Sequence, residues 1–305
     1  MNDNNNMPLF SPELMEKVAR LELRARMVAE GLLTGMHGSA SRGFNVEFLE
    51  HREYYPGDDP RHVDWKVFAK SGRYYVKQHE EEKNLQVYIV ADASASMDFG
   101  RSGAGDGSGK WKHGNLLAAA LAYLFLKQGD SVGLIIAGAG GRPAIEPRTS
   151  RGHLYRILGA LADTGPRGEA HIADSLRLLG EQSRRRCFAV VISDLLEDPG
   201  PVQDALRVIR GRGGEAVVFH VLSAAELDFP FTRASRFVDP ESGRDLTSDP
   251  TAVRALYLKN LNQFLDNYRD FCLRIGIDFV PAPTSTAAEE ILLGYLERRE
   301  RSKRR

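Results

Sequence analysis

The pattern of apolar and polar positions divides the chain into a short N-terminal part and a long α/β part. Residues 12–33 carry apolar side chains at helical spacing, which predicts an amphipathic helix. Residues 44–48 and 74–77 alternate apolar and polar positions on either side of a turn at residues 56–60, which predicts strand, turn and strand. We therefore expect residues 1–83 to form a small helix-plus-strand subdomain that packs against the main domain.

A different pattern begins near residue 84, where continuous apolar runs alternate with helical periodicity. Buried strands are predicted at residues 85–91, 131–137, 187–192, 215–222 and 277–280. Helices are predicted at residues 114–127, 152–162, 172–183, 202–210, 252–275 and 287–299, with an irregular stretch before the fifth of these. Alternation on this scale predicts an α/β fold, a doubly wound and mostly parallel sheet of Rossmann type, over residues 84–305 with a C-terminal helical extension.

Composition narrows the function classes. Among the 305 residues, Lys plus Arg and Asp plus Glu both number 41, so the chain lacks the basic field that drives nucleic-acid binding. The longest apolar run, residues 116–126, is shorter than the roughly 20 residues that a membrane-spanning helix needs, so we expect no stable membrane insertion. The N-terminus does not resemble a secretory signal, and Cys187 and Cys272 lie in apolar runs as buried free thiols would. These features predict a cytoplasmic protein.

Candidate chemistry gathers where two of the predicted strands end. The first strand runs into Asp92-Ala93-Ser94-Ala95-Ser96, and the third runs into Asp194. Ligands of doubly wound sheets bind beyond the carboxyl ends of the strands, and oxygens of this kind suit Mg²⁺, Mn²⁺ or Ca²⁺. A lone strand-end Asp more often caps a turn or a helix. Two of them beside a Ser-x-Ser turn favour a metal site formed by Asp92, Ser94, Ser96 and Asp194.

The Asp-x-Ser-x-Ser turn resembles the metal-ion-dependent adhesion site of von Willebrand factor A domains. This resemblance implies that Ser94 and Ser96 coordinate the ion directly and that an open position on the metal takes a carboxylate from a partner protein. In that family a Thr on a later loop is a further ligand, but Ala170 stands at the matching position here. Since an alanine cannot coordinate, either Glu169 substitutes for the threonine or the site is degenerate and metal-free.

A larger part of the chain, from Gly43 to Arg299, resembles the bacterial domain-of-unknown-function family fifty-eight, which carries a von Willebrand factor A-like domain. The matching segments are residues 50–66, 75–77, 80–82, 92–97, 228–231, 239–243 and 294–299. Residues 55–65, around Pro56 and Trp65, form the most specific of them. The resemblance implies a gene beside one for a MoxR-type AAA+ ATPase, and a role in helping that ATPase remodel or mature target complexes.

Three other segments have simpler interpretations. The Gly-rich residues 100–110 lack the glycine and the Ser or Thr that a phosphate-binding loop needs, so we interpret them as a flexible insertion. Residues 61–65 mix charge with Trp65, which favours a local network that fixes the turn over a docking surface. The basic residues 298–305 are typical of a solvated helix end.

The sequence therefore favours a non-enzymatic protein-interaction adaptor that works with a MoxR-type AAA+ ATPase and a protein client. The alternative is a metal-dependent hydrolase that uses Asp92 and Asp194 as ligands. Hydrolysis needs a general base or a second metal near the ion, whereas the neighbours Ala93, Ala95 and Ala170 are inert, which favours the adaptor.

Overall fold

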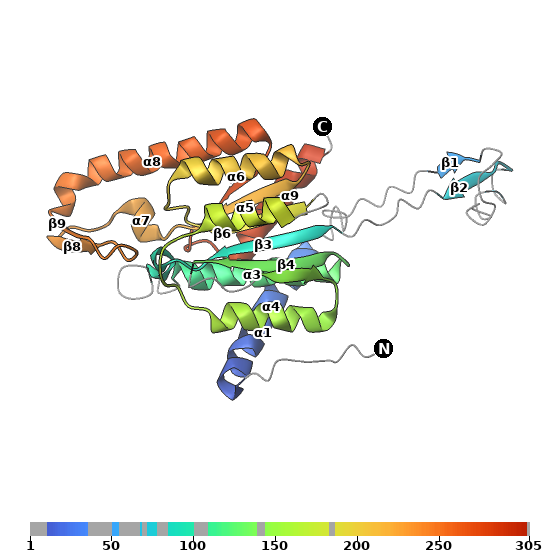
Figure 1. Cartoon of the computed structure of the whole chain (residues 1–305), viewed down its shortest axis with the longest axis horizontal. Helices are drawn as coiled ribbons and strands as arrows, with labels where there is room; N and C mark the ends of the chain where they lie inside the picture. The colour runs from blue at the N-terminus through green and yellow to red at the C-terminus, as the bar shows by residue number, and fades with distance from the viewer. Residues whose placement is uncertain are drawn as a thin grey trace.

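A mostly parallel sheet forms the centre of the molecule. The computed structural model describes residues 11–35, 51–54, 68, 72–77, 85–100, 109–138, 144–182 and 187–303. Within these ranges six strands pair in the order β10-β7-β6-β3-β4-β5 (Figure 1). Their bounds are β3 Gln86–Asp92, β4 Ser131–Ala137, β5 Ile145–Arg148, β6 Cys187–Ser193, β7 Glu215–His220 and β10 Asp278–Pro281. Each neighbouring pair is parallel except β4 with β5, so the predicted doubly wound sheet is confirmed.

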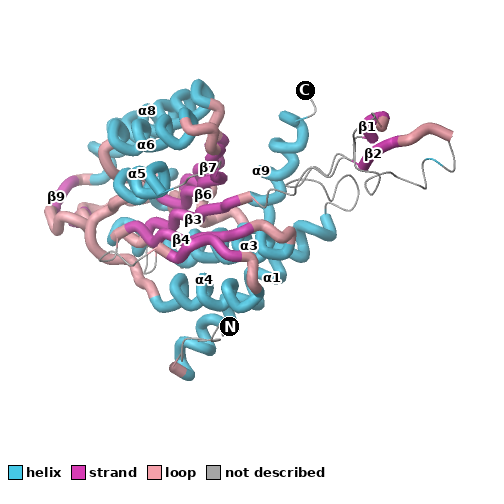
Figure 2. The backbone as a smooth tube through the Cα atoms, turned by 45° about the vertical axis from the view of Figure 1, so that its right-hand side comes forward, coloured by secondary structure: helices cyan, strands magenta, loops and turns pink. Residues whose placement is uncertain are grey.

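Helices cover both faces of the sheet (Figure 2). One face carries α1 Pro12–Gly35, α3 Lys110–Lys127, α4 Arg151–Asp163 and α9 Ala288–Lys303, and the other carries α5 Ile172–Gln182, α6 Pro199–Gly211 and α8 Pro250–Ile275. Along β3, Val87 and Ile89 pack on the first face, and Tyr88 and Val90 pack on the second. Burial on both faces explains why the strands read as continuous apolar runs.

The N-terminal helix belongs to the first of these layers. Helix α1 packs against α3, α4 and α9, and its buried Val18, Ala25 and Val28 join the same core as the sheet. The short antiparallel pair of β1 His51–Glu53 and β2 Tyr75–Lys77 stands apart from the sheet in Figure 1. The predicted strand at residues 44–48 and the tract at residues 55–65 lie outside the described residues, and the division at residue 83 stays a prediction.

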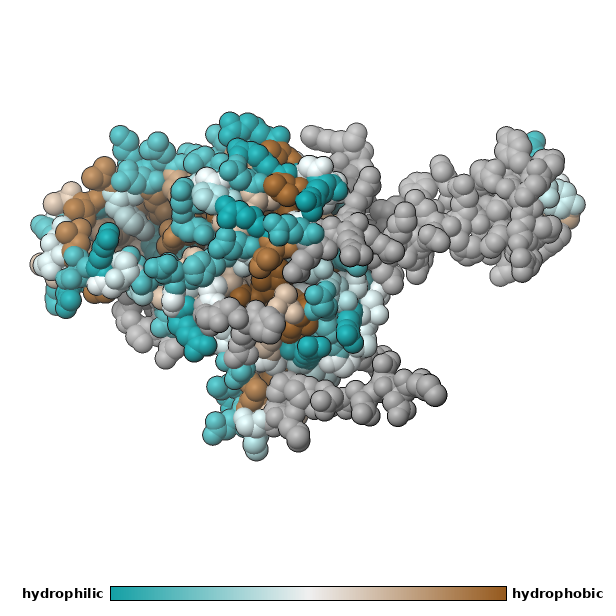
Figure 3. Space-filling view, in the orientation of Figure 1, coloured by the Kyte–Doolittle hydropathy of each residue, from teal (hydrophilic) through white to brown (hydrophobic). Residues whose placement is uncertain are grey.

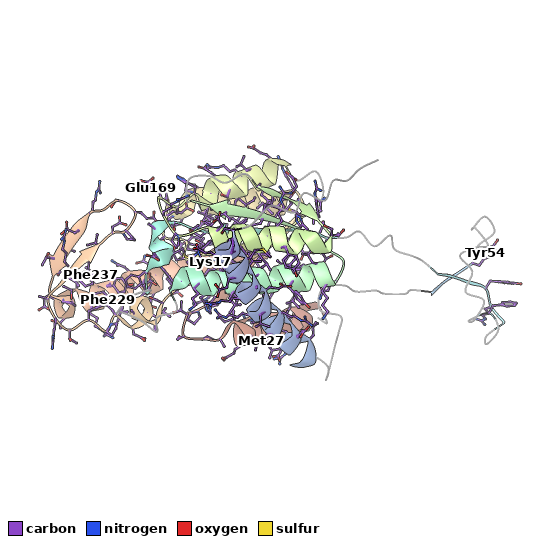
Figure 4. The ribbon with its side chains drawn as sticks, turned by 90° about the horizontal axis from the view of Figure 1, so that it is seen from below. Lys17, Met27, Tyr54, Glu169, Phe229 and Phe237 are labelled. Carbon is purple, nitrogen blue, oxygen red and sulfur yellow. The ribbon has the colours of Figure 1, made fainter. Side chains whose placement is uncertain are left out.

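The stretch between β7 and α8 was expected to be irregular, and that expectation is wrong. It contains α7 Ala224–Asp228 and an antiparallel hairpin of β8 Ser235–Val238 with β9 Asp245–Ser248. Phe229 anchors the hairpin, because its ring centroid lies 5.6 Å from that of Phe237 and 4.6 Å from that of Tyr257 on α8 (Figure 4). Because these aromatic contacts join separate segments of the chain, they leave no local periodicity. The pattern of apolar positions therefore did not reveal the hairpin.

Two further expectations can be compared with the described residues. Cys187 and Cys272 are buried and free, as predicted. Among the described helices none combines the length and the apolar character needed to cross a bilayer.

The start of the central strand is fixed by a buried carboxylate. Asp130 Oδ1 accepts a hydrogen bond of 3.1 Å from the backbone N–H of Leu85, whereas Oδ2 is buried and accepts none from the described residues. Burial raises the pKa of Asp130 from 3.8 to about 6, and the bond from Leu85 opposes this rise only in part. The folded state therefore holds the Asp130 proton more tightly than the unfolded chain does.

We predict that this carboxylate makes the fold lose stability as the pH rises from about 4 to about 6, because the charged form is the one that burial disfavours. Asp130→Asn should remove that loss and raise the free energy of unfolding above pH 7 by at most about 3 kcal/mol. Urea denaturation on either side of this pH range measures both effects. Asp204→Asn, at an exposed ion pair with Arg207, is the matched control and should leave the pH dependence unchanged. An Asp130→Asn variant that keeps the wild-type pH dependence would contradict the prediction.

Candidate functional site

The candidate site lies where the order of the strands reverses. Strand β3 is flanked by β4 on one side and by β6 on the other, because the chain runs from β3 to β4 and β5 and then crosses back to β6. This switch point is where doubly wound sheets bind ligands, beyond the carboxyl ends of the two strands. Asp92 ends β3, and Asp194 directly follows β6. The pairing of the two strands thus places both predicted carboxylates at one edge of the sheet.

The turn after β3 folds back on its own aspartate. Asp92 Oδ1 accepts a hydrogen bond of 2.9 Å from the backbone N–H of Ser94, and the hydroxyls of Ser94 and Ser96 are 3.0 Å apart. Gly138, at the end of β4, has a φ of 77°, and a Cβ there would lie 3.0 Å from the backbone nitrogen of Ser94. Only a glycine fits this close approach, so β4 supports the turn from the side.

Asp194 connects the second strand to this turn. Its Oδ2 accepts a hydrogen bond of 2.8 Å from Ser96 Oγ, and its Oδ1 accepts one of 3.2 Å from the backbone N–H of Leu196. Ser193 Oγ donates a 2.5 Å hydrogen bond to Asp92 Oδ2. The structure therefore brings together all four residues that the sequence nominated, and all four are buried.

Lys110 completes the cluster and was missed by the sequence interpretation. Its Nζ lies 2.6 Å from Asp194 Oδ2 and 2.6 Å from Glu226 Oε1, and the lysine side chain has no exposed surface. The interpretation of residues 100–110 as a flexible insertion is wrong at its C-terminal end, because Gly109 and Lys110 are buried at the start of α3. Residues 101–108 lie outside the described part of the chain.

A signal for Lys110 was present in the sequence. A cation in the first turn of a helix faces the positive end of the helix dipole, so a lysine directly before an apolar helix calls for acidic partners. Glu226 could also have been noticed, because Ser223 and Glu226 form a capping box at the start of α7. The carboxylates that contact Lys110 lie 84 and 116 residues further along the chain. No local sequence pattern predicts contacts at such separations.

Burial and neighbouring charge shift the acid–base properties of the cluster. Burial, and then the nearby charge of Asp194, raise the pKa of Asp92 to about 7, although hydrogen bonds from Ser193 and Ser94 oppose the rise. Burial lowers the pKa of the Lys110 ammonium, but attraction and hydrogen bonds from Asp194 and Glu226 outweigh burial, so that the pKa is raised overall. Lys110 is therefore a permanent cation.

His220, at the end of β7, is held as a neutral ring. Its Nε2 lies 2.8 Å from the backbone carbonyl oxygen of Asp194, and burial lowers its pKa to about 4. Since a neutral imidazole can donate to a carbonyl, His220 fixes the backbone that carries Asp194.

The loop expected to supply a threonine ligand is arranged differently. The backbone N–H of Ala170 donates a 3.2 Å hydrogen bond to Glu241 Oε2, from the turn between β8 and β9. The side chain of Glu169, which was considered as a substitute ligand, is exposed (Figure 4). The position of the missing threonine is therefore bordered by Glu241.

The donor set as arranged does not fit a divalent ion. Asp92 and Asp194 accept hydrogen bonds at all four carboxylate oxygens, and an ion would need to displace the Lys110 ammonium from Asp194 Oδ2. Mg²⁺ requires oxygen ligands in near-octahedral geometry and would repel the ammonium. Within the described ranges, no group of three or more His, Cys, Asp or Glu side chains is placed to hold a metal ion. Binding of Mg²⁺, Mn²⁺ or Ca²⁺ by Asp92, Ser94, Ser96 and Asp194 stays a prediction.

Comparison with known families identifies the chain. Residues 50–263 match the family described as "Protein of unknown function DUF58", which is more than half of the sequence. The chain belongs to this family. Uncharacterized proteins of Mycobacterium tuberculosis (strain ATCC 25618 / H37Rv) and Mycobacterium bovis (strain ATCC BAA-935 / AF2122/97) are each 34% identical to this DUF58 protein over 251 residues, covering 78% of it and 75% of the relative.

Solved structures resemble this DUF58 protein more distantly. The conserved hypothetical protein BatB from Bacteroides thetaiotaomicron is 14% identical with a TM-score of 0.44, over 71% of this chain and 99% of BatB. The SpRpn10 VWA domain is 13% identical with a TM-score of 0.39, over 68% of this chain and 93% of that domain. Similarity at this level supports no argument about function.

We predict that the hydroxyl of Ser193 stabilises the site, because it donates to Asp92 and accepts a 2.8 Å hydrogen bond from the backbone N–H of Leu195. Ser193→Ala should lower the free energy of unfolding by about 1–3 kcal/mol, since it leaves a buried carboxylate oxygen without its donor. Ser175→Ala is the control. Within the described residues the hydroxyl of this buried serine donates to the carbonyl oxygen of His171, just before its own helix, and its loss should cost less than about 0.5 kcal/mol. Equal effects of the two variants in urea denaturation would contradict the prediction.

Proposed function

We propose that this DUF58 protein is a non-enzymatic adaptor. It binds a protein partner at the rim of the carboxyl-end site, which is the site around Asp92 and Asp194; the rim consists of the exposed Leu196 and the β8–β9 hairpin. The partner proposed from the family resemblance is a MoxR-type AAA+ ATPase, with which the adaptor would remodel or mature a client complex. The proposal places the chain in the cytoplasm, which agrees with its two buried, unbridged thiols.

The observation that carries the proposal is the turn after Asp194. Leu195 is buried in the left-handed region at a φ of 54°, a conformation that costs a leucine about 1–2 kcal/mol. The next residue, Leu196, is 45% exposed although its backbone N–H is fixed to Asp194 Oδ1. Such strain persists only where the surrounding structure fixes it, and it often marks a binding segment. The site thus holds the large apolar side chain of Leu196 in a fixed, solvent-exposed position.

The β8–β9 hairpin is the second part of the rim and also carries apolar side chains. The exposed large apolar side chains of the β8–β9 hairpin and the start of α8 are Val238, Leu246 and Leu256, at 53%, 63% and 61% exposure, and Figure 3 shows apolar surface at this end of the molecule. The hairpin reaches the site through the hydrogen bond between Glu241 and Ala170. Exposed apolar patches beside polar groups commonly mark protein interaction surfaces.

The interior of the site supports binding rather than hydrolysis. A hydrolase needs a group free to activate water, whereas the carboxylate oxygens of Asp92 and Asp194 all accept hydrogen bonds within the protein. His220 is buried, and its Nε2 is bonded to the backbone of Asp194. The side chains at the strand ends therefore support the loops around them.

We predict that Leu196→Asp and Leu246→Asp each weaken binding to the MoxR-type ATPase of the same organism by at least about tenfold, equivalent to 1.4 kcal/mol, because each places a charge in an apolar contact. Biolayer interferometry with both purified proteins measures the affinity. Leu273→Asp is the matched control. Leu273 is the most exposed of the large apolar residues that the structure describes, at 77%, but it lies near the end of α8 that leads into β10, at the opposite edge of the sheet.

Two results would overturn the proposal. One is unchanged binding of both rim variants together with weakened binding of Leu273→Asp, which would move the docking surface to the other edge of the sheet. The other is hydrolysis of a phosphoester or peptide by the purified chain that is lost in Asp92→Ala. That result would replace the adaptor by a metal-dependent hydrolase.

A further inference from the structure

The Lys110 ammonium occupies the centre of the carboxyl-end site. It is bonded to Asp194, which follows β6, and to Glu226, which belongs to α7. The side chains of Lys110 and Asp194 have no exposed surface, and that of Glu226 is 14% exposed. The face of the Phe99 ring adds a third contact, with its centroid 5.9 Å from Nζ. The ammonium, which offers three donors, therefore has three contacts: two carboxylates and the face of one aromatic ring.

The ammonium lies beside residues that the sequence nominated as metal ligands. Asp194 Oδ2 accepts from Lys110 Nζ and from Ser96 Oγ, so the ammonium lies beside the hydroxyl and the carboxylate that were nominated as metal ligands. Carboxylates buried this deeply need a compensating positive charge, because a lone buried charge is strongly disfavoured. Lys110 supplies that charge from within the chain.

We infer that the Lys110 ammonium is the resident cation of this site, in place of a divalent metal ion, and that Glu226 supplies in cis the carboxylate that a partner would otherwise bring to the cation. Glu226 bonds Lys110 through Oε1, while its Oε2 accepts hydrogen bonds of 2.7 and 2.9 Å from the backbone N–H and hydroxyl of Ser223. The glutamate is thus held by the start of its own helix and directed at the cation.

A second departure from the adhesion-type pattern agrees with this inference. Ala170 removes the threonine ligand that a divalent ion would use, and the backbone N–H at that position bonds Glu241 instead. Without the threonine hydroxyl the site has one metal ligand fewer, and with the ammonium it already holds a positive charge. Both differences disfavour the binding of a divalent ion. The inference concerns the cation alone, and it does not depend on which partner binds the protein.

The test measures Mn²⁺ binding and thermal stability on the full chain, not partner binding. The wild-type protein should bind no Mn²⁺ in calorimetry, and its Tm should be the same in EDTA as in Mn²⁺ or Mg²⁺, since an ion that does not bind the native state cannot stabilise it. Lys110→Met keeps the volume of the side chain and removes its charge. It should lower the Tm in EDTA, gain a Mn²⁺ site and recover part of the lost Tm when Mn²⁺ is added.

Two further variants sharpen the test. Lys112→Met removes an exposed lysine of the same helix and should behave as the wild type in every measurement. Adding Ala170→Thr to Lys110→Met should tighten Mn²⁺ binding several-fold more, because it restores the missing hydroxyl, whereas Ala170→Thr alone should create no Mn²⁺ site.

Binding of Mn²⁺ by the wild-type chain with a rise in Tm, lost in Asp92→Ala, would overturn the inference. So would a folded Lys110→Met that keeps its Tm in EDTA and gains no Mn²⁺ site. Where Lys110→Met does not fold, the wild-type measurement still decides, and Glu226→Gln provides a second variant. It keeps the ammonium and should therefore also bind no Mn²⁺, so that Mn²⁺ binding by this variant would count against Lys110 as the resident cation.

Discussion

The burial of Asp92 and Asp194 beside each other, at the ends of two paired strands, is the constraint that organises the rest of the site. Both side chains are almost fully buried, and a carboxylate in such a place must be hydrogen-bonded and its charge compensated. Ser94, Ser96 and Ser193 supply the hydroxyl and backbone donors, and Lys110 supplies the charge. Removing one member of such a network leaves its partners uncompensated, so each removal costs more than the loss of a single hydrogen bond.

The same constraint explains the chain segments that surround the sheet edge. Lys110 begins α3 on one face of the sheet, and Glu226 belongs to α7, which leads into the β8–β9 hairpin and α8 on the other side. The ion pairs therefore join elements from the two layers across the end of the sheet. Glu241, from the same hairpin, bonds the loop before α5. A short helix and a short hairpin, which have little stability of their own, gain a fixed position from these long-range contacts.

The negative charge of an adhesion-type motif can be compensated in two ways. Strand-end carboxylates and a Ser-x-Ser turn bring hard oxygens together, and this cluster of negative charge requires a cation. The cation can be a divalent ion with an open position or an ammonium on the chain. With the ammonium, the acidic group that meets it is also internal, in Glu226. The surface beside this internal pair is apolar, with Leu196 and the hairpin residue Leu246 exposed.

The sequence by itself determined the sheet and the edge where the site lies. The apolar runs of β3, β4, β6 and β7 are continuous and buried on both faces, so the strands and the convergence of Asp92, Ser94, Ser96 and Asp194 followed from the pattern. Only the tertiary structure decided what faces those oxygens. Lys110 lies 84 residues before Asp194 and 116 before Glu226, and periodicity and capping rules act within one or two turns of chain. A buried ion pair depends on where whole elements pack, and packing places the ammonium where the sequence alone indicated a metal ion.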